Sequence, residues 1–206
     1  LMRHRLDIPP WDGKRVNGTL LVWAEQGMGE EILYASMVPE LVERARSVVL
    51  EVSSRLVDLF ARSIPGIRIV PIGSALDVSQ IDAQISLGSL GRYLRTKRES
   101  FPVRSSGYLK PDPSRAALLR KRFEGDPRKV VGLCWRSQGT TFGRFKTANL
   151  SSFLPLLQHA DYRFISVQYG DTATECEAIK RDYGVTVERR SEEHTSELQS
   201  RGLISY

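Results

Sequence analysis

The feature of the sequence that most constrains the fold is an alternation of short apolar runs that favour strands with amphipathic segments that favour helices. Strands are predicted at 19–24, 47–52 and 67–72, and helices at 30–45 and 54–63. Parallel strands need a crossover connection, which is most often a helix. The βαβαβ pattern therefore predicts an α/β fold with a parallel sheet covered by helices.

The first predicted helix contains a proline, and a fourth strand is predicted after the third. Pro39 should bend or restart the helix at 30–45. The fourth strand is predicted at 82–87, followed by a turn from Gly88 to Arg98 and a loop up to Gly107. The apolar positions expected on one side of the first helix are Ile32, Ala35, Val38, Leu41, Val42 and Ala45.

A second alternation is predicted after a linker helix. Asp112 is expected to cap this helix, Pro113 to open it, and Ala117, Leu118 and Phe123 to be available for burial. The elements predicted next are a strand at 129–135, a helix at 149–159, a strand at 163–168, and a helix at 172–184 that Gly184 ends. About two strands of a second sheet are thus expected, with a cleft between the two units.

Composition places the chain among globular proteins. It has 206 residues, of which 41% are hydrophobic, and no apolar run approaches the roughly 18 residues of a membrane span. The first residues are too polar for a secretory signal. Cys134 and Cys176 are expected to be reduced, buried or half-buried thiols. A cytoplasmic location is therefore predicted.

The formal net charge of +6 is compatible with nucleic acid, an anionic small molecule or a solvated surface. Basic residues cluster from Arg92 to Arg104. The zinc spacings and aromatic-rich motifs of common nucleic-acid modules are missing from the sequence. A solvated or phosphate-facing surface is therefore favoured, and nucleic acid is not expected as a partner.

The stretch RSEEHTSELQS, from Arg190 to Ser200, resembles the translation of a widely used short-read sequencing adapter. The match is residue for residue. We therefore expect 190–206 to be an artefact of the library and exclude it from fold reasoning. The alternative is a genuine polar tail. Without 190–206, which carries a net charge of −1 (two Arg and three Glu), the chain carries +7.

The turn after the first strand, EQGMGEE, combines glycines with carboxylates at the start of a helix. Glycines allow close backbone approach, and the first turn of a helix leaves amide N–H groups unpaired, so this turn is a candidate ligand site. It is not the dinucleotide fingerprint, because Ile32 stands where a third glycine is needed after Gly27 and Gly29.

Several short motifs in their order resemble one family. These are WDG near the start, LLVWAEQGMGEEILYASMVPEL, LGSLGRY, GYLKPDP, VGLCWRS and FISVQYGD. Together they resemble the glycosyltransferase region of bacterial tetratricopeptide-repeat proteins, which is related to heptosyltransferases and more distantly to O-linked N-acetylglucosamine transferases. The resemblance covers Trp11 to about Val187 and implies the GT-B fold, in which two Rossmann-like domains face a cleft.

The resemblance implies a division of the chain. We expect an N-terminal stub or linker at 1–18, an acceptor-side Rossmann-like domain at 19–110, a linker helix at 111–128, a truncated donor-side Rossmann-like domain at 129–189, and the artefact at 190–206. With the second domain truncated, this chain is expected to be inactive by itself and to expose sheet edges that favour aggregation. Tetratricopeptide repeats are expected upstream in the parent protein.

The resemblance also implies roles for the residues of the opening turn. In relatives an aspartate at the helix start resembles the general base that takes the proton of the acceptor hydroxyl, and here that position is Glu30. Glu25, Gln26, Gly27 and Gly29 would form the acceptor-side turn. The alternative is that Glu30 and its neighbour only complement the helix dipole.

The loop RSQGTTFGRFK resembles the place where these enzymes receive the diphosphate of the donor. Cations and hydroxyl groups there would stabilise the charge that grows on the leaving diphosphate. The candidate donor-side residues are Arg136, Thr140, Thr141, Arg144 and Lys146, with Gln168 as a possible nucleotide contact. The alternative is an ordinary exposed basic loop.

The resemblance implies an inverting glycosyltransferase that moves a sugar from a nucleotide sugar to a hydroxyl of a protein or glycan. The resemblance implies metal-independent GT-B chemistry, with which the absence of a D-x-D pair from the sequence agrees, so no metal is expected. The nucleotide sugar would be a substrate, and no cofactor is expected. Two alternatives remain: a non-catalytic Rossmann-like scaffold or binding module, and a nucleotide-binding enzyme of different chemistry.

Overall fold

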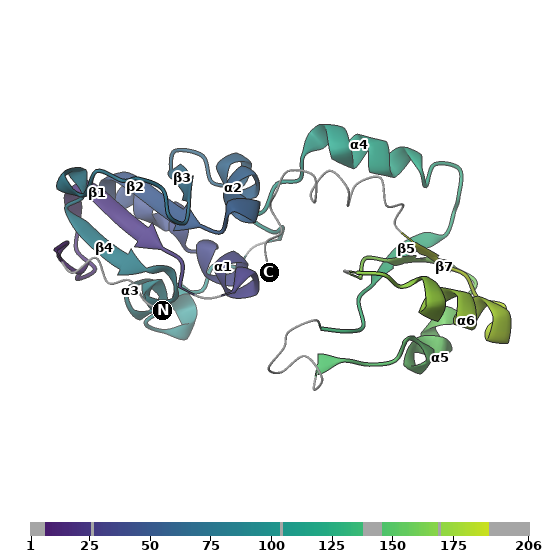
Figure 1. Ribbon diagram of the computed structural model, residues 1–206. Helices are drawn as coiled ribbons and strands as arrows, with labels where there is room; N and C mark the ends of the chain where they lie inside the picture. The colour runs from purple at the N-terminus through teal and green to yellow at the C-terminus, as the bar shows by residue number, and fades with distance from the viewer. Residues whose placement is uncertain (1–6, 26, 104, 138–145, 169, 190–206) are drawn as a thin grey trace. The chain divides into compact units, whose positions relative to one another are not determined.

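A computed structural model describes residues 7–25, 27–103, 105–137, 146–168 and 170–189. The chain divides into two compact units, Leu1–Ala116 and Ala117–Tyr206, and the division falls within the helix that we expected to act as a linker. Figure 1 labels the elements of both units. The predictions for 190–206 lie outside the described residues.

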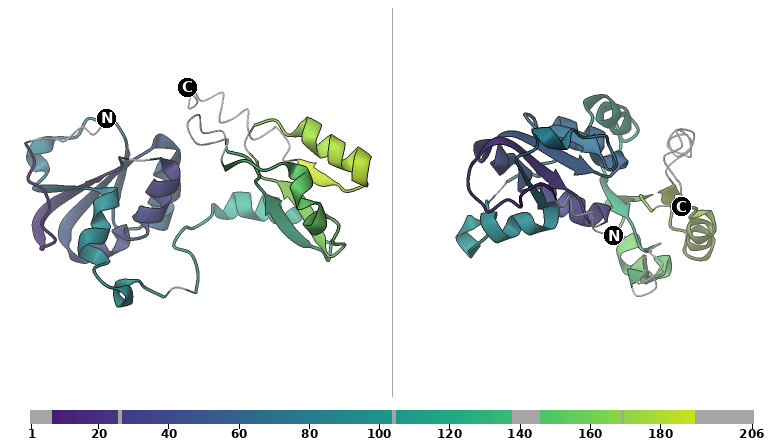
Figure 2. Two further views of the ribbon diagram at one scale, coloured as in Figure 1. Left: turned by 90° about the horizontal axis from the view of Figure 1, so that it is seen from below. Right: turned by 60° about the vertical axis from the view of Figure 1, so that its left-hand side comes forward.

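The first unit is built on a four-stranded sheet in which every pair is parallel. Its strands are β1 (Val16–Trp23), β2 (Ala45–Val52), β3 (Arg68–Pro71) and β4 (Ala83–Ser86), in the spatial order β3-β2-β1-β4. The predicted parallel α/β sheet is confirmed. Figure 2 shows its strands side by side with helices packed against them.

The N-terminal segment extends this sheet at the free edge of β4. Pro10 forms a parallel bridge to Gln84. The Trp11 N–H donates to the Gln84 carbonyl at 2.8 Å, and the Gln84 N–H donates to the Pro9 carbonyl at 2.9 Å. These bonds satisfy backbone groups that an edge strand leaves unpaired, and they bring Trp11 to the end of the sheet.

The connections of the first unit are short helices. The α-helices are α1 (Met28–Ala35), α2 (Val57–Ser63) and α3 (Gly91–Leu94), and the 3-10 helices are η1 (Val38–Glu43), η2 (Ser54–Leu56), η3 (Val78–Gln80), η4 (Leu87–Leu90) and η5 (Arg98–Ser100). No helix among the described residues is long and apolar enough to cross a membrane.

The two faces of the sheet are covered differently, because successive side chains of a strand point to opposite faces. Leu20 and Val22 of β1 belong to the main core cluster, together with Phe60 of α2 and Leu90 of η4. Leu21, between them, belongs to a smaller cluster with Ile8 and Ile81. The helices therefore pack mainly on one face, while the N-terminal segment and the β3–β4 connection contribute to the other.

Pro39 restarts the helix, as predicted. α1 ends at Ala35 and η1 begins at Val38 with the proline at its first turn. Two positions assigned to the apolar side of this helix are wrong, because Val42 is exposed and Ala45 is the first residue of β2. The 3-10 geometry of η1 changes the side-chain spacing, so a period set by α1 cannot be continued through it.

The segment from Gly88 to Arg98 was predicted to be a turn, and it is largely helical. It contains the end of η4 and all of α3. Leu90 and Leu94 from this segment are buried in the main core. Each helix has four residues, which is too short for helical periodicity to stand out in the sequence.

The second unit contains a three-stranded parallel sheet. Its strands are β5 (Lys129–Leu133), β6 (Tyr162–Ser166) and β7 (Val187–Arg189), in the order β5-β6-β7. Its helices are η7 (Leu150–Phe153), α5 (Leu154–Leu157) and α6 (Ala173–Tyr183). The helix α4 (Pro113–Lys121) begins in the first unit and ends in the second. α6 lies beside β7 in Figure 2.

Some local signals in this unit are confirmed and others are wrong. The Asp112 carboxylate accepts the Arg115 N–H at 2.9 Å at the start of α4, and Gly184 ends α6 with a φ of +70°. Ala117 and Leu118 are exposed, contrary to expectation. β7 was not predicted as a strand, because its three residues are too few to show alternation.

Candidate functional site

The first unit has a topological switch point between β1 and β4. The chain runs outwards from β1 through β2 to β3 and then returns to the other side of β1. Trp23 and Ser86 pair at the carboxyl ends of β1 and β4. Open parallel sheets bind ligands in the crevice outside the carboxyl ends of the strands at such a point. The turns that follow Trp23 and Ser86 therefore form the candidate site.

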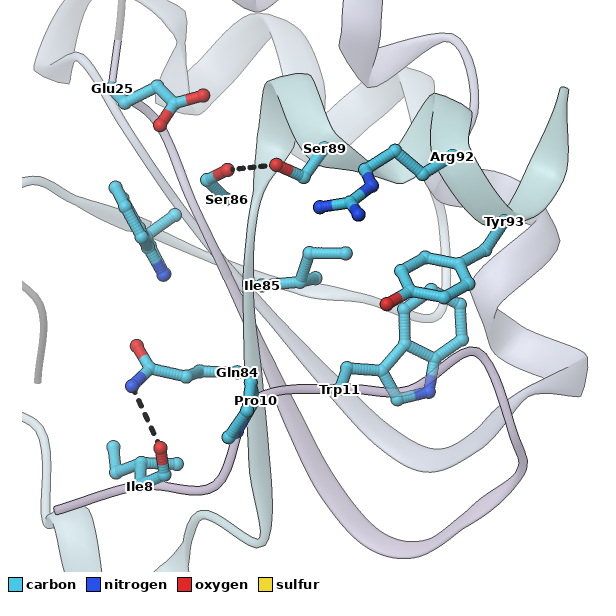
Figure 3. Close-up of a pocket in the computed structure, with 11 residues that line it drawn as sticks. Ile8, Pro10, Trp11, Glu25, Gln84, Ile85, Ser86, Ser89, Arg92 and Tyr93 are labelled. Carbon is cyan, nitrogen blue, oxygen red and sulfur yellow. Dashed lines mark hydrogen bonds between the residues drawn. The ribbon is translucent and has the colours of Figure 1, made fainter. Parts of the chain in front are cut away.

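A pocket of about 620 Å³ lies at this end of the sheet, a volume within the usual range for small-molecule sites. Figure 3 shows its lining, which mixes aromatic rings with hydroxyl, amide and charged groups. The lining residues are Ile8, Pro10, Trp11, Trp23, Glu25, Gln84, Ile85, Ser86, Ser89, Arg92 and Tyr93. None of the lining residues except Glu25 was predicted from the sequence to belong to the site.

The WDG motif builds one wall of this pocket. The Trp11 ring is buried, and its Nε1 donates to the Lys14 carbonyl at 2.7 Å. Gly13 has a φ of +88°, and a Cβ at this position would lie 2.5 Å from Cδ1 of Tyr93. The rings of Trp11 and Tyr93 have centroids 5.1 Å apart and are tilted by 59°. Gly13 is thus needed both for its backbone conformation and for space beside Tyr93.

Hydroxyl and charged groups also line this pocket. The Ser86 hydroxyl donates to the Ser89 hydroxyl at 2.8 Å. Figure 3 shows the carboxylate of Glu25 and the guanidinium of Arg92 on opposite sides of this serine pair. Within the described part of the chain, neither charged group makes a hydrogen bond or ion pair. Both remain available to a ligand.

The predicted opening turn lies next to this pocket. Glu25 lines it and also a small neighbouring cavity, which Glu30 lines too. Gly27 is the N-cap of α1, and a Cβ there would lie 3.1 Å from Oε2 of Glu30. Gly29 lies in the first turn of α1 with open space around its Cα. Gln26 lies outside the described residues.

Glu30 and Glu31 have different surroundings. Glu30 is exposed, and in the described chain its carboxylate has no hydrogen-bond or salt-bridge partner. Glu31 is only 2% exposed, and it accepts the Ser53 N–H at 2.9 Å and a short hydrogen bond from the Ser53 hydroxyl. Glu31 therefore fixes α1 to the end of β2. Sequence reasoning missed this role, for which a polar residue in an apolar stripe is the only signal.

In the second unit, the predicted donor loop starts at the carboxyl end of β5. The Ala148 N–H donates to the Trp135 carbonyl at 2.7 Å and closes the base of the loop. A second pocket, of about 590 Å³, lies there and is lined by both Arg136 and Lys146. Thr140, Thr141 and Arg144 lie outside the described residues.

Two of the predicted donor-side residues hold the loop itself. The Arg136 guanidinium donates to the Asp171 carbonyl and lies 3.4 Å from a carboxylate oxygen of Glu175. Gln168 Oε1 accepts the N–H groups of Trp135 and Arg136, each at 3.0 Å. Gln168 Nε2 donates to the Arg136 carbonyl, also at 3.0 Å. Both side chains fix the start of the loop, whereas Lys146 is exposed.

The two cysteines differ in their environments. Cys134 is exposed beside the second pocket, contrary to the expectation of burial. Cys176 is buried in the core of this unit, and its burial raises the pKa of the thiol. The described residues contain no group of three or more His, Cys, Asp or Glu that could hold a metal ion.

Comparison with known proteins adds one relative. No family model matches the chain, and no solved structure matches it. A search of curated proteins finds "Protein FlbA" of Caulobacter vibrioides, which is 28% identical over 204 aligned residues. The alignment covers 89% of this chain but 34% of FlbA, so the chain spans about a third of the length of this relative. The chain is thus similar in sequence to one part of FlbA.

Proposed function

We propose that this chain is part of an inverting glycosyltransferase that uses a nucleotide sugar and needs no metal ion, with the two units forming a GT-B arrangement. The order of the motifs from WDG to FISVQYGD supports the family. Two successive parallel α/β units, each with a pocket at the carboxyl end of a strand, are what such an enzyme requires.

One observation carries the proposal: an exposed carboxylate lies at the start of α1, next to the switch point of the first sheet. Glu30 has no partner in the described chain, while the adjacent Glu31 is bound to Ser53. A general base needs a carboxylate that a substrate can reach. Glu30 is therefore the residue to which we assign the base.

The proposed reaction is a direct displacement. Glu30 accepts the proton of the acceptor hydroxyl while the oxygen of that hydroxyl forms a bond to the anomeric carbon of the donor. The bond from that carbon to the diphosphate breaks, and the nucleoside diphosphate leaves with the electron pair. Lys146, exposed in the second pocket, would stabilise the charge of the diphosphate. Arg136 would position the loop.

The second candidate function is a non-catalytic binding module. It is favoured by the position of Glu30 in the first turn of α1, where a carboxylate stabilises the helix dipole without any chemistry. The engagement of Arg136 with Asp171 and Glu175 points the same way, because it leaves less positive charge for a donor. Turnover distinguishes the two candidates.

The test uses the protein expressed from its complete reading frame. A panel of nucleotide sugars is supplied, and release of nucleoside diphosphate is measured for the wild type, Glu30→Gln and Glu43→Gln. Glu43 is an exposed glutamate of η1 outside both pockets and serves as the matched control. We expect Glu30→Gln to lower the rate by about 10²–10⁴-fold, and Glu43→Gln to leave it unchanged.

Two outcomes would overturn the assignment. If the wild type releases no nucleoside diphosphate from any donor, the binding-module function is the better one. If Glu30→Gln is as active as Glu43→Gln, the base is another residue.

We also propose an acceptor hydroxyl on a protein or glycan, and tetratricopeptide repeats upstream in the parent protein. A cytoplasmic location is proposed too, in keeping with the reduced thiols expected at Cys134 and Cys176.

A further inference from the structure

We propose that the pocket at the carboxyl ends of β1 and β4 binds a hydroxylated carboxylate, in chemical class an acidic sugar. The inference concerns the pocket of Figure 3, whose aromatic wall and Arg92 the proposed mechanism does not use. The role of this ligand as the acceptor rests on the proposed transferase function, whereas its binding to the pocket is independent of that function.

The pocket contains two charged side chains, Arg92 and Glu25, that are not paired with each other. Arg92 is exposed, lines the pocket and has no hydrogen-bond or ion-pair partner in the described chain. Glu25, across the Ser86–Ser89 pair, has none either, and the two charges do not bond to each other. A ligand that places an anion at Arg92 and donates hydroxyl groups to Glu25 would satisfy both.

Arg92 also differs from the other arginine of the same helical segment. Arg95 forms an ion pair with Glu40, and its side chain is 8% exposed, so that arginine holds α3 to η1. This ion pair raises the pKa of the Arg95 guanidinium through its hydrogen bond to Glu40. The basic cluster noted in the sequence therefore has at least two roles, and Arg92 is the member directed to the pocket.

The walls of the pocket suit a sugar ring. Trp11 is fixed by its bond to the Lys14 carbonyl, and Tyr93 packs against it. Figure 3 shows the Tyr93 hydroxyl directed towards the interior of the pocket. Tyr and Trp offer an apolar surface with a polar end, which matches a ring that has apolar faces and hydroxyl groups at its edge. The volume of about 620 Å³ accommodates such a ring.

The balance of charges favours a carboxylate over a phosphate. Among the described residues, the lining contains one cation, Arg92, one anion, Glu25, and no lysine. A phosphate group carries about −1.5 to −2 charges at neutral pH, so it would leave negative charge uncompensated beside Glu25. A carboxylate carries one charge and matches the planar guanidinium in a bidentate pair.

The test measures binding without any donor. The tryptophan indole N–H signals of the 206-residue chain are followed by NMR during titration with glucuronate, glucose or glucose 6-phosphate at millimolar concentrations. Trp11 and Trp23 line the pocket, whereas Trp135 lies in the second unit. The variants are Arg92→Gln and Glu25→Gln. The matched control is Arg98→Gln, an exposed arginine of η5 outside the pocket.

We expect glucuronate to shift the signals of Trp11 and Trp23 and not that of Trp135. Glucose should bind about tenfold more weakly than glucuronate. Arg92→Gln should lower the affinity for glucuronate by about tenfold, as expected for the loss of one charge-assisted hydrogen bond. Glu25→Gln should lower the affinity for glucuronate less than Arg92→Gln does, and Arg98→Gln should leave this affinity unchanged.

Any of four results would overturn the inference: no shift with glucuronate, equal affinity for glucose, unchanged affinity in Arg92→Gln, or tighter binding of glucose 6-phosphate. Because the titration contains no nucleotide sugar, its outcome is independent of turnover. If glucuronate binds but the complete protein has no transferase activity, the binding site is supported and the role of the ligand as acceptor is refuted. Transferase activity without binding would refute this pocket alone.

Discussion

Single residues of this chain have roles that only their surroundings decide. Glu30 and Glu31 are chemically identical neighbours, yet one is exposed and the other is buried against Ser53. Consecutive residues of a helix point about 100° apart, so a one-residue step separates the exposed side of α1 from its buried side. The Glu30–Glu31 pair was found from sequence, but the separate roles of its two members were not.

Glu31→Gln should destabilise the protein. The substitution removes the charge from a carboxylate that accepts two hydrogen bonds from Ser53, and such bonds are worth about 1.5–3 kcal/mol. Glu30→Gln, one residue away and exposed, should change the free energy of unfolding by no more than about 0.5 kcal/mol. Urea unfolding followed by circular dichroism measures both. Equal effects would contradict the structural role of Glu31.

Gly13→Ala should cost more stability than Gly66→Ala. Both glycines have a positive φ, +88° and +83°, but a Cβ at Gly13 would lie 2.5 Å from the Tyr93 ring and one at Gly66 meets open space. The backbone term of about 1 kcal/mol or more is common to both. The difference between their unfolding free energies therefore measures the contact with Tyr93, and no difference would mean that Gly13 does not shape the pocket.

Cys134 should react with thiol reagents in the native protein, whereas Cys176 should not. Cys134 is exposed, while Cys176 is 5% exposed and its burial raises the pKa of the thiol, which lowers the fraction of reactive thiolate. Alkylation with N-ethylmaleimide followed by peptide mass spectrometry gives the ratio of the labelling rates of Cys134 and Cys176. Labelling of both cysteines at one rate would show that the core of the second unit is open.

Among the elements, all four strands of the first sheet and the first two strands of the second sheet lie at predicted strands, whereas α3 and β7 were not predicted. Each of the strands β1, β2, β5 and β6 lies at a predicted apolar run, and Pro39 and Gly184 interrupt or end helices where expected. α3 and β7 were missed, because four and three residues are shorter than the period that would reveal them. Tertiary contacts decide such segments.

Ionic contacts join the start of β5 to β6 and β7. Asp126 forms ion pairs with Arg128 and Arg163, and Arg163 also pairs with Glu188. The guanidinium of Arg163 lies 4.9 Å from the centroid of the Phe123 ring. The contacts of Arg163 join side chains that lie far apart in the sequence, so no local motif predicts them.

The Asp126 carboxylate should make the second unit sensitive to acid. Its hydrogen bond to Arg128 lowers the pKa from an ordinary value of 3.8 to about 2. The folded pKa lies below the unfolded one, so the stabilisation is complete above about pH 4 and is lost as the pH falls through 2. Asp126→Asn should abolish this part of the pH dependence. An NMR titration of the carboxyl that gives an ordinary pKa would contradict the contact.

For the whole molecule, two α/β units were predicted from the sequence, but the pocket at the carboxyl ends of β1 and β4 was not. The units have separate hydrophobic clusters, one around Phe60 and one around Trp135. The pocket combines an N-terminal segment around Trp11 with Ser86 and Arg92. Trp11 is distant in the chain from Ser86 and Arg92, and pairing of the N-terminal segment with β4 brings it to them, so no spacing pattern could have identified the pocket.

The proposed transferase requires that the second unit bind the diphosphate of a nucleotide sugar. Hydrogen–deuterium exchange of the protein from its complete reading frame, with and without a set of nucleoside diphosphates, tests it most directly. We expect slower exchange in peptides that cover 132–137 and 146–150, at the pocket lined by Lys146. This protection should be lost in Lys146→Met but not in Lys129→Met, a change of an exposed lysine of β5. Protection confined to the first unit, or none with any nucleoside diphosphate, would contradict it.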